Sequence, residues 1–168
     1  MPGKLNWRNS YTYVQTQTVK IVRYQQLHQP AFERLNRSWI EKYFWMEPVD
    51  FDVLQRPEEY ILGNGGEIFM AMIEEAIVGT VALKFVSDGI YEFTKMAVDE
   101  QFRGKQIGRK LANAAIQHAR GVGANKIILY SNTILLPAIE LYIKLGFREV
   151  PVDGPYKRSN IKMELDLI

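Results

Sequence analysis

Alternating apolar and polar residues predict β-strands in five parts of this chain. The alternating stretches are residues 19–24, 67–73, 76–85, 89–98 and 161–167. Glu74 and Glu75 separate the second stretch from the third, which is a hairpin signal, and the fourth continues the pair as an antiparallel meander. Residues 126–130 are largely apolar, as in a strand that is buried on both faces and pairs in parallel, and residues 147–150 predict one more short strand.

Apolar residues spaced by three or four predict the helices. We expect helices over residues 30–43, 101–120 and 137–145, with short helical turns over residues 51–62. Pro30 and Pro137 suit the first turn of a helix, and Gly121 and Gly146 suit the end of one. The order of these elements predicts a single α/β domain whose mixed, mostly antiparallel central sheet is flanked by helices on both faces.

The chain of 168 residues has the length of one domain with a substantial core. Residues 1–18 are polar with scattered aromatics and no sustained period, so we interpret them as a loose arm or an edge segment and assign the domain to residues 19–168. The first residues lack the basic-then-apolar order of a signal peptide, and no apolar run approaches the roughly 18 residues of a membrane-spanning helix. We therefore expect a cytoplasmic protein that does not bind membranes.

Composition removes several classes of chemistry. Hydrophobic residues make up 47% of the chain and charged residues 24%, as in ordinary globular proteins. The absence of cysteine excludes disulfides, thiolate catalysis and cysteine-bound metals, and with only His28 and His118 we expect no metal site. The net charge of +2 is too small to indicate nucleic-acid binding, which needs a dense basic surface.

Residues 96–111 combine the end of a strand, a basic turn and the start of a helix. This segment carries four cations, Arg103, Lys105, Arg109 and Lys110. Gly104 and Gly108 let the backbone approach a ligand closely, and the free amides of a helix N-terminus bind anions. The segment therefore predicts a phosphate site, although its cations also suit a solvated surface. Dinucleotide-binding and P-loop patterns do not match, because an acidic residue near position 125 and a Gly-Lys-Ser/Thr sequence are both missing.

The order of the elements narrows this prediction. A strand meander is followed by the Arg103-Gly104 turn, a long helix, a buried strand, and a helix that ends in residues 141–147. This arrangement resembles the GNAT superfamily of acyl-coenzyme A dependent N-acetyltransferases over residues 19–168, which implies acetyl-CoA as co-substrate. The family's turn reads Arg/Gln-x-x-Gly-x-Gly/Ala and matches residues 103–108 except at Gln106, where the family usually has glycine.

The resemblance also implies which residues bind the co-substrate. Backbone amides of the turn would hold the pyrophosphate, while Met96 and Val98 would pair with the pantetheine arm. The residues implied are Met96, Val98, Arg103, Gly104, Lys105, Gln106, Ile107, Gly108, Arg109, Lys110 and Asn132. The family's Asn-x-x-Ala-x-x-x-Tyr pattern would place its asparagine at Leu135, so Asn132 either reaches the cofactor from a longer loop or is a turn residue.

Acetyl transfer to an amine needs a base more than an acid. An alkyl amine with a pKa near 10.4 lies about three units from its reactive neutral form at pH 7, roughly 4 kcal/mol, whereas a thiol near 8.5 leaves readily. Glu92 matches the strand glutamate that many family members use as base, and alternation places it on the face of Thr94, Met96 and Val98. Tyr142 matches the family's general acid near the thioester sulfur. The respective alternatives are a structural glutamate and a core aromatic.

Two segments are candidates for the acceptor side of the site. Large side chains are dense at the end of the first predicted helix and just after it: Trp39, Tyr43, Phe44, Trp45 and Met46. They suit core packing, and part of the cluster also suits a pocket wall. In the loop before the last strand, Tyr156 and Arg158 suit a substrate carboxylate or aromatic group, because an arginine fork matches a carboxylate. A plain polar hairpin loop is the alternative.

The sequence therefore predicts an N-acetyltransferase that moves the acetyl group of acetyl-CoA to a primary amine of a small molecule by direct attack. The alternatives are a protein or peptide N-acetyltransferase, a non-catalytic coenzyme A-binding module, and an interaction domain whose basic helix binds acidic partners or nucleic acid. The identity of the acceptor, an acyl group other than acetyl, and a homodimer all stay open.

Overall fold

The computed structural model of the chain describes residues 17–168, so the arm or edge segment expected over residues 1–18 lies almost wholly outside the described residues. The strands are β1 (Val19–Arg23), β2 (Glu67–Ile73), β3 (Ala76–Ser87), β4 (Ile90–Val98), β5 (Lys126–Ser131), β6 (Arg148–Val150) and β7 (Ile161–Asp166). The helices are α1 (Gln29–Tyr43), α2 (Pro48–Gln55), α3 (Pro57–Tyr60), α4 (Ile107–Gly121) and α5 (Leu136–Lys144), with 3₁₀ turns at Gln26–His28, Leu62–Asn64 and Glu100–Phe102. Every strand expected from the alternation is present.

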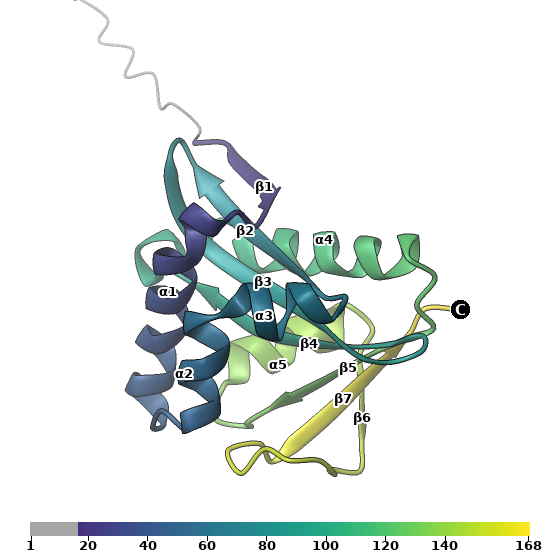
Figure 1. Cartoon of the computed structure of the whole chain (residues 1–168). Helices are drawn as coiled ribbons and strands as arrows, with labels where there is room; N and C mark the ends of the chain where they lie inside the picture. The colour runs from purple at the N-terminus through teal and green to yellow at the C-terminus, as the bar shows by residue number, and fades with distance from the viewer. Residues whose placement is uncertain (1–16) are drawn as a thin grey trace, which may run out of the picture.

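The strands form one sheet in the order β1-β2-β3-β4-β5-β7-β6 (Figure 1). Strands β1 to β4 are antiparallel neighbours, which confirms the meander, and the β2–β3 hairpin turns at Glu74 with a left-handed φ of 55°. Strand β5 lies parallel to β4, because the chain crosses over through α4 between them. Strands β7 and β6 are then added antiparallel beyond β5.

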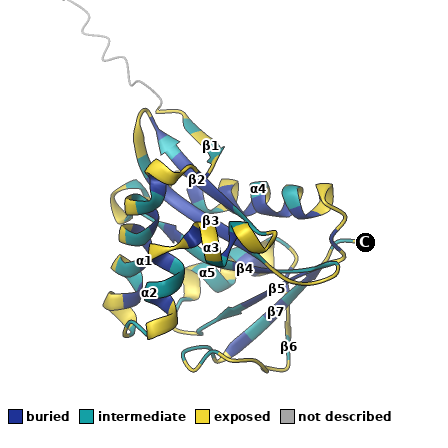
Figure 2. Cartoon of the chain, viewed as in Figure 1, coloured by how far each residue is buried: buried dark blue, intermediate teal, exposed yellow. Residues whose placement is uncertain are grey.

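Helices cover both faces of the sheet (Figure 1). On one face, α4 and α5 pack against the central strands through a core that includes Leu111, Ala115 and Tyr142. On the other face, α1 and α2 enclose a second core in which Phe32 and Leu54 are fully buried. Figure 2 shows the buried residues along the central strands and on the inward sides of the helices. The apolar stripes read from the sequence thus become two cores, one on each side of the sheet.

A bulge interrupts the alternation in the middle of β4. Ala82 of β3 pairs with Thr94 and Thr80 pairs with Ala97, so β4 contains one extra residue, and Lys95 within it has a left-handed φ of 53°. A bulge moves every later side chain to the other face of its strand. Met96 accordingly packs in the α4-side core together with Phe93, the residue that follows Glu92.

The prediction that Glu92 shares a face with Met96 and Val98 is therefore wrong. Strict alternation gave that result, and the extra residue at Lys95 reverses it. Glu92 and Thr94 pair with Lys84 and Ala82 of β3, and Ala82 belongs to the core on the α1 side. The base candidate and the predicted pantetheine strand thus lie on opposite faces of the same strand.

Two helices begin elsewhere than the apolar spacing indicates. Helix α2 begins at Pro48, upstream of residue 51, because proline suits the first helical turn and Asp50 caps the turn by accepting from the Glu47 amide at 2.9 Å. Helix α4 begins only at Ile107, because the preceding turn takes left-handed backbone at Gly104 and Gln106. Within residues 17–168, no helix combines the length and apolar character needed to cross a bilayer.

Candidate active site

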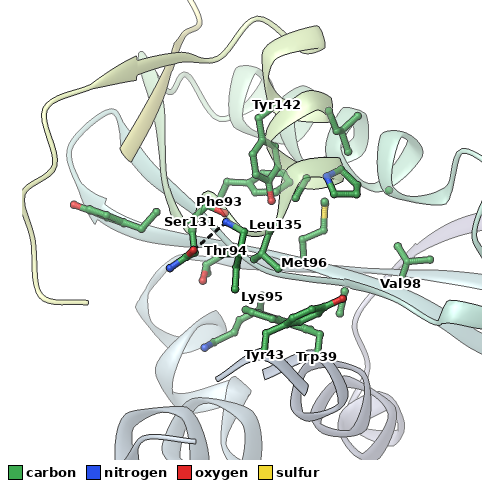
Figure 3. Close-up of a pocket in the computed structure, with 18 of the residues that line it drawn as sticks. Trp39, Tyr43, Phe93, Thr94, Lys95, Met96, Val98, Ser131, Leu135 and Tyr142 are labelled. Carbon is green, nitrogen blue, oxygen red and sulfur yellow. Dashed lines mark hydrogen bonds between the residues drawn. The ribbon is translucent and has the colours of Figure 1, made fainter. Parts of the chain in front are cut away.

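A cleft of about 670 Å³ lies where β4 and β5 separate (Figure 3). The two strands pair from Ile90 with Lys126 as far as Phe93 with Leu129, and β4 then continues to Val98 without β5 beside it. The backbone edge of β4 beyond Phe93 is therefore open for hydrogen bonds to a ligand. Side chains from both faces of the sheet line the cleft, with Tyr142 above β4 and Trp39 and Tyr43 below it in Figure 3.

The basic turn forms the end of the cleft next to α4. Gly104 has a φ of 80° and Gln106 a φ of 61°, and together they turn the chain so that α4 starts at Ile107 beside β4. The first amides of a helix have no partner within the helix and carry partial positive charge. The start of α4 thus presents its first amides to the cleft, at the turn where the sequence predicts a phosphate site.

The structure separates the predicted co-substrate residues into two groups. Those that line the cleft are Met96, Val98, Arg103, Gly104, Gln106, Ile107, Gly108, Arg109 and Asn132. Lys105 and Lys110 do not line it. Lys105 donates to Gln17 at 3.0 Å and lies 6.0 Å from the Phe102 ring, which is the solvated role weighed as the alternative.

Glu92 lines the cleft on β4 just before the two strands part. Its side chain is buried, with 6% of the residue exposed, and its Oε2 accepts a 3.0 Å hydrogen bond from the Tyr156 hydroxyl. Burial raises the pKa of Glu92, while the Tyr156 hydrogen bond and the charges of Lys84 and Lys95 partly offset that rise. A carboxylate with a raised pKa is a stronger base than an exposed one.

Tyr142 lies on α5 and directs its hydroxyl toward the cleft (Figure 3). Its ring lies edge-on to Phe93 at 5.7 Å and packs in the α4-side core. Burial raises the pKa of Tyr142 well above the usual 10.0, so the hydroxyl keeps its proton at neutral pH. Tyr142 is thus a core aromatic and a cleft-lining hydrogen-bond donor at once, and the two readings of the sequence do not exclude each other.

An ion cluster that sequence reasoning missed lies at the other end of the cleft. Asp50, 1% exposed, accepts from Arg158 Nη1 at 2.5 Å, from Arg158 Nη2 at 2.9 Å and from Lys95 Nζ at 3.2 Å. Burial would raise the pKa of Asp50, but these donors and the Glu47 amide lower it to about 2. Residues Lys95 and Arg158 line the cleft, while Asp50 lies behind them. In the sequence, Asp50 can be recognised from the Glu-Pro-x-Asp order of a helix cap. No sequence signal indicates the bulge that directs the Lys95 side chain toward Asp50.

Other residues of the acceptor segments are only partly in the cleft. Trp39, Tyr43 and Phe44 line it, whereas Trp45 is 61% exposed and Met46 packs on the α1-side core. Part of the aromatic cluster therefore lines the cleft, in agreement with the prediction that some of these residues form a pocket wall. Tyr156 and Arg158 also line the cleft, so the loop before β7 is more than a polar hairpin loop.

Asn132 makes the contacts of a turn residue. Its Oδ1 accepts from the Ile134 amide at 3.0 Å, and its Nδ2 donates to the Arg158 carbonyl at 2.8 Å. The side chain thereby ties the β5–α5 turn to the loop before β7 at the edge of the cleft. Tyr130 and Ser131, which sequence reasoning did not select, line the same edge, and the Tyr130 ring lies edge-on to Tyr156 at 5.1 Å.

The cleft fits a coenzyme A thioester on three structural grounds. The open edge of β4 offers backbone groups to an extended amide-containing arm. An added Cβ at Gly104 would meet no atom within 4 Å, which leaves room at the anion-binding turn. At Gly108 an added Cβ would lie 3.5 Å from Leu141 Cδ2 and 3.9 Å from Met96 Cε, so a larger side chain there would fill space at the start of α4 that glycine leaves free.

Comparison with solved structures defines the class of protein first. A GNAT-family acetyltransferase from Staphylococcus aureus Mu50 superposes with a TM-score of 0.83 at 22% identity, covering 90% of this chain and 100% of that one. A Salmonella typhimurium protein titled yncA, solved with its cofactor acetyl-CoA, superposes with a TM-score of 0.73 at 19% identity, covering 89% of this chain and 94% of that one. The fold is that of the acetyltransferases.

The chain belongs to the acetyltransferase (GNAT) family, whose model matches residues 23–147. Members of this family use acetyl-CoA as co-substrate, so the predicted family, fold class and co-substrate are confirmed. The N-acetylaspartate synthetase of Xenopus tropicalis is 32% identical over 97 residues, which are 56% of this chain and 36% of that protein. The chain spans about a third to a half of the length of the curated relatives it matches.

Proposed function

We propose that this protein transfers the acetyl group of acetyl-CoA to a primary amine of a small molecule by direct attack. The observation that carries the proposal is the buried carboxyl of Glu92, which lines the cleft where β4 and β5 part. A carboxylate in that place can receive the proton of an amine that enters beside the thioester. The open edge of β4 and the amides of α4 support the co-substrate part of the proposal.

In the proposed reaction, Glu92 takes one proton from the bound ammonium and leaves a neutral amine. The nitrogen then attacks the thioester carbonyl carbon, the new C–N bond replaces the C–S bond, and the sulfur leaves as a thiolate. The second proton lost by the nitrogen balances the proton that the thiolate gains on becoming a thiol. Free amides of β4 beyond Phe93 donate to the carbonyl oxygen as negative charge develops on it.

Tyr142 has a more limited part in this reaction than a full proton donor. Burial raises the pKa of its hydroxyl above 10.0, whereas a departing thiol has a pKa near 8.5, so complete proton transfer from tyrosine to thiolate is uphill. We propose that the Tyr142 hydroxyl instead donates a hydrogen bond to the leaving sulfur. A hydrogen bond to a charged group stabilises it by about 1.5 to 3 kcal/mol.

Two observations support a small acceptor. The cleft is lined by the aromatic side chains of Trp39, Tyr43, Phe44 and Tyr156, and such a lining suits a compact ligand. A relative bears the name N-acetylaspartate synthetase, which denotes a small amine as acceptor in that protein. A lysine-bearing peptide is the competing acceptor and belongs in every assay.

The test is thiol release from acetyl-CoA with a panel of primary amines and one lysine-bearing peptide. We expect Glu92→Gln to lower kcat/KM by about 100-fold or more, and Tyr142→Phe to lower kcat by about 10-fold. Glu164→Gln, which changes a strand glutamate paired with Lys126 outside the cleft, serves as the matched control and keeps full activity.

Three results would contradict parts of the proposal. Full activity of the Glu92→Gln variant removes the base assignment. Binding of acetyl-CoA in calorimetry without thiol release for any amine points to a non-catalytic module instead. Faster turnover of the peptide than of every small amine replaces the small-molecule acceptor with a protein acceptor.

A further inference from the structure

We infer that the acceptor carries a carboxylate beside its amine, and that Lys95 and Arg158 determine specificity by binding that carboxylate. The inference rests on the function proposed above and names the substrate class of the same cleft. It starts from the two cations at the end of the cleft away from α4, both of which line it.

The first step is the arrangement of charge in this part of the cleft. Lys95 and Arg158 share a single carboxylate, Asp50, whose two oxygens accept from both cations and from the Glu47 amide. Glu47 also acts electrostatically on Arg158, and Glu92 on Lys95, but Asp50 is the carboxylate that accepts hydrogen bonds from both cations. Among the described lining residues of the cleft, the acidic side chain is Glu92, and the proposed reaction occupies it with the incoming ammonium.

The second step concerns the donors that remain. A lysine ammonium has three N–H groups and an arginine guanidinium five. Among the described residues, one N–H group of the Lys95 ammonium donates a hydrogen bond, to Asp50. Those of Arg158 go to Asp50 and, at 2.7 Å from Nη1, to the Trp45 carbonyl, so its Nε is left for a further acceptor. Both cations can therefore donate to a ligand without leaving Asp50.

The third step is the position of these cations relative to Glu92. Lys95 follows Glu92 by three residues on β4, a span on the order of 10 Å along a strand. The Lys95 side chain points away from Met96 (Figure 3). It reaches Asp50 of α2, and Glu92 lies near enough to act on its charge. An acceptor whose ammonium lies at Glu92 can thus extend its other end toward Lys95 and Arg158.

The fourth step follows from electrostatics. A plain alkylammonium presents its charge to Glu92 but leaves the remaining donors of Lys95 and Arg158 without an acceptor. An amino carboxylate presents its ammonium to Glu92 and its carboxylate to the two cations, so that both ends meet opposite charge. Complementary charge at both ends therefore favours the amino carboxylate over the plain amine.

The test compares acceptors that differ only in the carboxylate. The pairs are β-alanine with propylamine, γ-aminobutyrate with butylamine, and L-phenylalanine with phenethylamine, each measured by thiol release alongside a lysine-bearing peptide. For the wild-type protein we expect kcat/KM to favour the amino carboxylate by about 10-fold or more in at least one pair, the effect of one charge-assisted hydrogen bond.

The variants ask whether Lys95 causes this preference. Lys95→Met is expected to lower the ratio of kcat/KM within the preferred pair by about 10-fold, mainly through KM for the amino carboxylate, and Lys95→Arg is expected to restore it. Lys126→Met is the matched control, because Lys126 also pairs with a carboxylate, Glu164, but does not line the cleft, and it should keep the wild-type ratio. Thermal unfolding of each variant shows whether the fold is intact.

The outcomes separate this inference from the function on which it rests. Equal kcat/KM for both members of every pair, with acetyl transfer taking place, overturns the carboxylate inference and leaves the transferase function standing. A preferred pair whose ratio does not change in Lys95→Met also overturns it, and assigns Lys95 a structural role. Thiol release with none of the acceptors overturns the proposed function, and the inference falls with it.

Discussion

Gln106 is the residue where the chain departs from the family's usual turn, and the structure shows that its backbone conformation is one that favours glycine. Its backbone lies in the left-handed region with a φ of 61°, where a side chain costs about 1 to 2 kcal/mol that glycine avoids. The amide that a phosphate would contact is the same in either residue. Strain at this position therefore lowers the stability of the fold rather than the affinity of the turn for phosphate.

We expect Gln106→Gly to stabilise the protein by about 1 kcal/mol or less, because relief of the left-handed strain exceeds the extra entropy of glycine in the unfolded chain. Chemical denaturation measures this change. KM for acetyl-CoA should change by less than about threefold, because the backbone donor is kept. Gln106→Ala keeps the strain and serves as control. A Gln106→Gly variant that is less stable than wild type would contradict this account of the turn.

Glu92 illustrates how a buried base lowers stability. Burial raises its pKa in the folded protein above the usual 4.5. A carboxyl with a raised folded pKa destabilises the fold fully at pH values above that pKa, and the penalty shrinks as the pH falls from the folded pKa to the unfolded value of 4.5. Each unit of raised pKa corresponds to about 1.4 kcal/mol.

Glu92→Gln should therefore be more stable than wild type at pH 7 to 8, although it is less active, because the amide carries no charge and still accepts from Tyr156. The stability difference should shrink toward zero as the pH falls through the folded pKa to 4.5. Urea denaturation across this range measures it. A difference that does not vary with pH would mean that Glu92 is not a charged, buried base.

At the scale of single elements, the sequence predicted what local chemistry decides. Alternation located five of the strands and helical spacing the three longer helices, because those patterns follow directly from the geometry of strands and helices, while an apolar run located β5. The same patterns could not show the bulge at Lys95. A bulge leaves no mark in composition, yet it moves Met96 and Val98 to the face opposite Glu92.

The bulge also explains which site residues sequence reasoning found. Glu92, Tyr142 and the turn over residues 103–108 stand at positions that a family pattern fixes along the chain. Lys95 reaches Asp50 only because the extra residue turns its side chain toward α2. Asp50 in turn joins Arg158 across 108 positions of sequence, a contact that no local pattern encodes.

At the scale of the whole molecule, the Asp50–Arg158 pair joins α2 to the loop before β7. Donors from both segments hold the pKa of Asp50 at about 2 against the effect of burial. A carboxyl with a lowered folded pKa contributes stability at pH values above 3.8, and that contribution is lost as the pH falls through about 2. Acid should therefore weaken this long-range connection progressively as the pH falls from 3.8 toward about 2.

We expect Asp50→Asn to destabilise the protein at pH 7 by about 3 kcal/mol, because it leaves the half-buried cations Lys95 and Arg158 without their shared carboxylate. The difference from wild type should shrink as the pH falls from 3.8 toward about 2, since the wild-type carboxyl then becomes neutral as well. Denaturant titrations at several pH values measure both effects. Asp153→Asn, which removes an exposed partner of Lys162, is the control and should change stability little. Parallel loss of stability in wild type and Asp50→Asn down to pH 2 would show that some other group governs acid unfolding, and that the Asp50 cluster does not hold α2 and the loop before β7 together.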